Sequence, residues 1–79
     1  MNNYSKWSIK WVVIMTAKEM FEELGYELKD GYSNIVYENI NNNSIIFWTN
    51  ENITFQVKYI SAKLLTAVNK QIEELGWND

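Results

Sequence analysis

The chain has 79 residues and a formal net charge of −3, and it contains neither cysteine nor histidine. A chain of this length buries one hydrophobic core, so we expect a single domain. The absence of cysteine excludes disulfide bonds and thiolate metal sites and favours a cytoplasmic protein. The longest continuous apolar run, residues 11–15, is too short to span a membrane.

The same composition narrows the chemistry. Histidine and cysteine supply the commonest general base and the thiol nucleophile of enzymes, and neither a glycine-rich phosphate loop nor a metal-ligand spacing is present. We therefore expect a non-enzymatic protein without a cofactor. All cationic side chains are lysine, whereas arginine is the usual bidentate ligand of phosphate and guanine, so the composition argues against nucleic acid as the partner.

Residues 1–14 form an N-terminal extension ahead of a domain that we place at residues 15–79. Trp7, Ile9, Trp11 and Val13 occupy every second position, the first three separated by Ser8 and Lys10, which predicts a strand. Trp7, Trp11 and Ile14 also fit a helical stripe. The β-branched run that follows favours the strand. Such a strand would cover an edge of the sheet or pair with a second copy as a dimerisation arm.

A helix is predicted over residues 17–24. Thr16 and Glu19 have the spacing of a capping box, in which each side chain bonds the other residue's backbone amide. Gly25 can take the left-handed conformation that ends a helix, and this places Tyr26 against Phe21.

The next segments have the period of strands. Ile53, Phe55, Val57 and Tyr59 alternate with polar residues, which predicts a strand with one buried face. Two further strands are predicted over residues 44–49, apolar on both faces, and 34–40, with Ile35 and Tyr37 on one side. Asparagine-rich turns at residues 41–43 and 50–52 join the three strands as a meander.

The second helix is predicted over residues 62–75. Ser61 is its N-cap, and its apolar stripe is formed by Leu64, Leu65, Val68, Ile72 and Leu75. Gly76 repeats the stop signal of Gly25.

Together these elements predict an α+β fold: a helix, a three-stranded antiparallel meander and a helix, with both helices on one sheet face. The other face is then uncovered. Because the middle strand is apolar on both sides, either Ile46 and Trp48 or Ile45 and Phe47 must point away from the helices.

Three stretches carry a resemblance to a family of very short uncharacterised proteins encoded by phages and prophages of low-GC Gram-positive bacteria. They are MTAKEMFEELGY at residues 15–26, SIIFWTN at 44–50 and AVNKQIEELGW at 67–77. The resemblance spans roughly residues 15–77, and residues 1–14 precede the point where such proteins typically begin. It implies a phage accessory protein, and no catalytic or binding residues come with it.

Two sets of residues are candidate contact surfaces. Large aromatic residues on an uncovered face mark interaction surfaces, although they also fill ordinary cores. The interface candidates are Trp7, Trp11, Ile46 and Trp48. The second set is an acidic patch for a basic partner, whose alternative is a solvated surface, and it comprises Glu22, Glu23, Glu73 and Glu74.

We therefore expect a homodimeric protein that acts by binding a protein of the host or the phage, blocking a host enzyme or defence factor. The alternative is a small structural or regulatory homodimeric module with weak nucleic-acid contact. The order helix, three strands, helix is also that of double-stranded RNA-binding domains, but their lysine cluster is reduced here to Lys63.

Overall fold

Two helices and four strands form in the part of the chain that the computed structural model describes, residues 15–30 and 33–77. In chain order they are α2 (Ala17–Glu23), β1 (Glu27–Asp30), β2 (Ile35–Glu38), β3 (Ser44–Phe47), β4 (Ile53–Gln56) and α3 (Ala62–Leu75). The predicted α+β class, the two helices and the antiparallel meander are confirmed.

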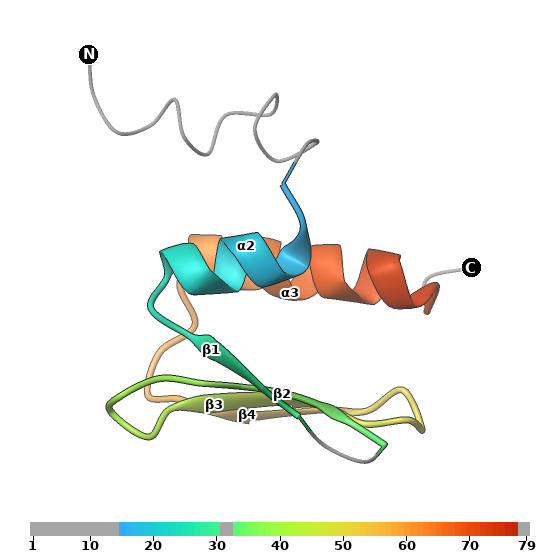
Figure 1. The fold of residues 1–79 in the computed structure, drawn as a ribbon, viewed down its shortest axis with the longest axis horizontal. Coiled ribbons are helices and arrows are strands. Elements are labelled where there is room, and N and C mark those ends of the chain that lie inside the picture. Colours follow the sequence, from blue (N-terminus) through green and yellow to red (C-terminus); the bar gives the residue numbers. More distant parts are fainter. Residues whose placement is uncertain (1–14, 31–32, 78–79) are drawn as a thin grey trace.

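The helices and the sheet form two layers. Figure 1 shows α2 and α3 side by side over the same face of the sheet, running in opposite directions, while no described element covers the other face. This arrangement follows from the sequence pattern, because each helix carries one apolar stripe and must bury it against a single partner surface.

The sheet is a simple antiparallel meander in the order β1-β2-β3-β4. Its register separates the side chains into rows that alternate between the two faces. One row facing the helices contains Leu28, Tyr37, Ile45 and Phe55. The adjacent row on the opposite face contains Lys29, Val36, Ile46 and Thr54.

The prediction of three strands was too low by one, because β1 was missed. Its sequence, Glu-Leu-Lys-Asp, offers a single apolar residue, Leu28, and no β-branched residue. Pairing with β2 makes it a strand, which local pattern does not reveal. The strand predicted within residues 1–14 lies outside the described residues.

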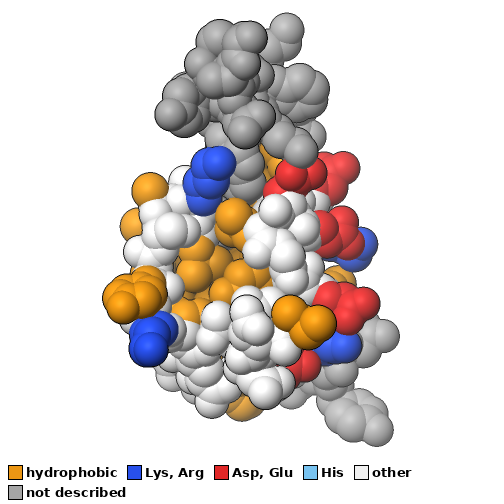
Figure 2. All heavy atoms as spheres, turned by 90° about the vertical axis from the view of Figure 1, so that its left-hand side faces the viewer, with side chains coloured by type: hydrophobic (Ala, Val, Ile, Leu, Met, Phe, Trp, Pro, Cys, Tyr) orange, Lys and Arg blue, Asp and Glu red, His pale blue; other side chains and the backbone are white. Residues whose placement is uncertain are grey.

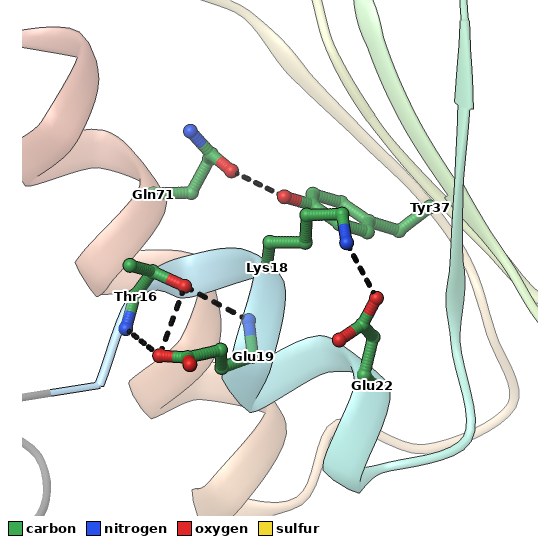
Figure 3. Close-up of polar contacts among 6 residues, drawn as sticks. All are labelled: Thr16, Lys18, Glu19, Glu22, Tyr37 and Gln71. Atoms are coloured by element: carbon green, nitrogen blue, oxygen red, sulfur yellow. Dashed lines mark hydrogen bonds and ion pairs between the residues drawn. The ribbon is translucent and has the colours of Figure 1, made fainter.

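Local capping chemistry fixes the ends of α2 as predicted. The Thr16 hydroxyl accepts from the Glu19 amide at 3.1 Å, and the Glu19 carboxylate accepts from the Thr16 amide at 2.8 Å (Figure 3). At the other end Gly25 has φ of 89°, and the Tyr26 amide donates to the Phe21 carbonyl at 2.9 Å. The Phe21 and Tyr26 rings then meet edge to face with centroids 5.9 Å apart.

The second helix obeys the same rules. The Ser61 hydroxyl accepts from the Leu64 amide at 3.0 Å, and Gly76 ends α3 in the left-handed conformation. The Trp77 amide donates to the Ile72 carbonyl at 3.1 Å, as the Tyr26 amide does to Phe21. The bounds predicted for this helix, residues 62–75, are confirmed.

The core lies between the helices and the sheet. The rings of Phe21 from α2 and Tyr37 from β2 are stacked with centroids 3.9 Å apart, and Phe47 meets both edge to face. The Tyr37 hydroxyl donates to Oε1 of the buried Gln71 on α3 at 2.7 Å (Figure 3). This bond gives a polar tip inside the core its partner and ties the second strand to the second helix.

Candidate protein-binding surface

The sheet face turned away from the helices is the first candidate surface, and we call it the open face. Val36 and Ile46 are neighbours on adjacent strands in its central row, and both are only partly buried. The register turns Ile45 and Phe47 to the helices, where both are buried. The two alternatives left by the sequence are thus decided in favour of Ile46 and Trp48 pointing away.

Trp48 follows β3 directly and is the most prominent aromatic residue of the open face. It is 39% exposed, and its indole N–H donates to the Thr54 hydroxyl of β4 at 2.8 Å. Its backbone amide donates to the Asn52 carbonyl at 2.8 Å. The ring is therefore held in one place while part of its surface stays exposed to water. A partner that binds this surface loses less free energy to ordering the side chain, because Trp48 is already fixed.

The rest of the open face is polar. Glu27, Glu38, Ser44 and Gln56 form the row beside Val36 and Ile46. Within it the Ser44 hydroxyl donates to Gln56 Oε1 at 2.6 Å. A row with such side chains is compatible with water, so between β2 and β3 the apolar part of this face is a narrow strip formed by Val36, Ile46 and Trp48. Outside the strands, the exposed Ile40 lies beside Glu27 and Glu38.

An ion pair occupies one edge of the open face. Lys29 Nζ lies 2.9 Å from Glu27 Oε1 on β1. The hydrogen bond between them lowers the pKa of Glu27 and raises the pKa of Lys29, and the nearby charges add to both shifts. Because both side chains are exposed to solvent, this pair contributes little to stability.

The four glutamates of the proposed acidic patch divide between the two ends of the helix pair. Glu22 and Glu23 lie at the end of α2, while Glu73 and Glu74 lie at the end of α3, beside the start of α2. Because α2 is seven residues long, the pairs are separated by about 9 Å along the helix axis, close to a Debye length in physiological salt. The structure does not bring them together as one cluster.

Several of these carboxylates already have partners. Glu22 pairs with Lys18 at 2.7 Å (Figure 3), and Glu73 pairs with Lys70 at 3.0 Å. Glu74 has a structural role, because its Oε2 accepts from the Ala17 amide at 2.8 Å and so caps α2 from the last turn of α3.

Sequence reasoning missed a third surface, at the connection from β4 to α3. Tyr59, Ile60 and Leu65 are 79%, 51% and 47% exposed. Figure 2 views this end of the molecule and shows hydrophobic side chains gathered at its centre, with acidic side chains along one flank. The alternation of apolar residues predicts a strand that extends to Tyr59, but β4 ends at Gln56. Because the alternation continues past Gln56, the local sequence does not reveal that Tyr59 lies outside the strand.

Trp7 and Trp11, the other two interface candidates, lie outside the described residues. Among residues 15–30 and 33–77, no group of three acidic side chains is placed to hold a metal ion, and neither helix is long and apolar enough to cross a membrane. Comparison with family models, with curated proteins and with solved structures finds no match to this chain.

Proposed function

We propose that this chain acts by binding another protein molecule and does not catalyse a reaction. The surface that it uses is the open face, and the first partner is a second copy of the chain. The observation that carries the proposal is the apolar strip of Val36, Ile46 and Trp48 on a sheet face that no described element covers.

The strip suits a partner with the same surface. In a two-fold contact each copy presents the same patch, so Ile46 and Trp48 of one chain meet the corresponding strip of the other. Two sheets pack face to face about 10 Å apart, and aromatic side chains at the centre of such a contact carry most of its energy. Glu27, Glu38 and Lys29 then lie toward the rim, where charges stay hydrated.

The size of the face sets the strength of this association. Four strands about 4.8 Å apart and four residues long give a footprint of roughly 250 Å² per chain. Stable dimers bury about 800 Å² per partner, so we expect a weak contact that forms at high protein concentration. A weak homodimer can also exchange its second copy for a different protein that offers a better complement.

The non-catalytic character of the proposal is supported by the sequence, which lacks histidine and cysteine. The resemblance to short phage-encoded proteins extends the proposal to a bacterial host protein as the second partner, and to an inhibitory role inside the host cell.

Sedimentation equilibrium of the full chain over about two decades of concentration tests the proposal. We expect the average mass to rise with concentration for the unmodified protein. Trp48→Lys should weaken the association about 30-fold, because losing a central aromatic anchor costs about 2 kcal/mol and each 1.4 kcal/mol is tenfold. Ile46→Lys, on the same strip, should act in the same direction.

Tyr59→Lys is the matched control. It changes an exposed aromatic residue to lysine, with the same change in net charge, but at the connection from β4 to α3. It should leave the association unchanged. A mass that stays monomeric at every concentration contradicts self-association. Loss of the dimer in Tyr59→Lys but not in Trp48→Lys would show that the contact forms at the connection from β4 to α3, which contradicts the open face as the interface. Circular dichroism of each variant verifies that the fold is intact.

A further inference from the structure

A hollow of about 340 Å³ opens between the end of α3 and the β2–β3 end of the sheet. Its lining includes the apolar residues Ile35, Phe47, Leu75 and Trp77, together with Trp48 and polar residues such as Thr49. The Phe47 and Trp77 rings lie 6.2 Å apart at a 52° tilt, so they form two sides of an aromatic corner. The volume is at the low end of small-molecule sites and suits a single large side chain.

Helix α2 begins close to the end of α3 that lines this hollow. The Ala17 amide donates to Glu74 Oε2 at 2.8 Å, which holds the start of α2 against the last turn of α3. Glu74 is followed directly by Leu75, a wall of the hollow, and Met15 packs against the same core. Residues 1–14 therefore join the described part of the chain at Met15, close to the last turn of α3, which contributes Leu75 to the hollow.

The sequence of that segment supplies suitable occupants. Trp7 and Trp11 precede Met15 by eight and four residues. An extended chain covers about 3.3 Å per residue, which gives Trp11 a reach of about 13 Å and Trp7 a reach of about 26 Å. A large flat indole would complete the aromatic corner of Phe47 and Trp77 in the offset or edge-to-face geometry that such rings prefer.

We propose that the hollow is the docking site for a tryptophan of residues 1–14 of the same chain, either Trp7 or Trp11. Tethering favours this occupant over any other, because a short linker holds a group at an effective concentration in the millimolar range. A separate molecule has to exceed that concentration or bind far more tightly to displace it. Docking of a tryptophan in the hollow does not depend on the proposed function of the open face.

Nuclear magnetic resonance of the full chain provides the test. With only four tryptophans, the indole N–H signals are separable, and Trp7→Ala and Trp11→Ala assign two of them by loss. We expect nuclear Overhauser contacts from the methyl groups of Ile35 and Leu75 to one of these two indoles. The hydrogen exchange of that indole N–H should be at least tenfold slower than that of the other.

The variants also serve as reciprocal controls. Replacing the docked tryptophan should shift the Ile35 and Leu75 methyl signals as the ring is lost, whereas replacing the other tryptophan should leave them in place. Neither variant changes a residue that lines the hollow.

A mixed sample of isotope-labelled and unlabelled chains identifies the source of the indole. Contacts within one chain support the proposal. Contacts seen only between labelled and unlabelled chains overturn it in favour of segment exchange between two copies, and the absence of any contact from Trp7 or Trp11 overturns it outright.

Discussion

Replacing Glu74 by alanine tests the contact that joins the two helices. The Glu74 carboxylate accepts a hydrogen bond from the Ala17 amide at 2.8 Å, in a partly buried place. Ala17 is itself fully buried, and its amide is one of the first-turn donors of α2 that have no partner within the helix. Water therefore cannot easily take the place of the lost carboxylate.

The magnitude follows from two opposing effects. A hydrogen bond to a charged acceptor contributes about 1.5–3 kcal/mol, and a donor left buried without a partner costs a similar amount. Against this, removing a carboxylate from the last turn of α3 relieves an unfavourable interaction with the helix dipole of about 0.3–1 kcal/mol. Because losing the hydrogen bond outweighs relieving the dipole, we expect Glu74→Ala to lower the free energy of unfolding by about 1.5 kcal/mol.

Urea denaturation followed by tryptophan fluorescence measures this change. Glu73→Ala is the matched control, because Glu73 is next in sequence, its side chain is 62% exposed, and it forms a surface ion pair with Lys70. That variant should lose no more than about 0.5 kcal/mol. Glu74→Gln keeps an acceptor oxygen without the charge and should fall between the two. Equal losses in Glu74→Ala and Glu73→Ala would refute the reasoning.

Two further predictions concern the core and a helix end. Burial raises the pKa of Tyr37 to about 12, with smaller contributions from nearby glutamates. A tyrosine in the unfolded chain ionises near pH 10, so the free energy of unfolding should stay constant up to about that pH. It should then fall by about 2 kcal/mol as the pH approaches 12. Tyr37→Phe should flatten that alkaline decline, and it should cost about 1–3 kcal/mol at neutral pH because Gln71 loses its hydrogen-bond donor. Denaturation at a series of pH values measures both effects. Equal alkaline slopes in the two proteins would exclude Tyr37 as the titrating group. Gly25→Ala should cost about 1 kcal/mol, because φ is 89° there although an added methyl group meets no atom within 4 Å; thermal unfolding measures it, and an unchanged midpoint would show that backbone strain is absent.

Local sequence determined those features that depend on neighbouring residues. Each helix end depends on a stretch of four to six consecutive residues. The structure confirms the capping box of Thr16 and Glu19 and the helix stops at Gly25 and Gly76. Helix α3 has the predicted bounds because its cap and its stop both lie in its own sequence. For the two helices and for β2, β3 and β4, the local period of apolar residues was enough to distinguish helix from strand.

Tertiary structure decided which residues meet. Strand β1 exists because β2 pairs with it, and its charged sequence gives little local sign of this. The choice between the two faces of β3 depends on register, because a shift of one residue would expose Phe47 and bury Ile46. The assignment of Trp48 to the open face, the bond between Tyr37 and Gln71, and the role of Glu74 as a cap all join residues far apart in the chain. No local pattern encodes such contacts, because they form only when the two layers pack.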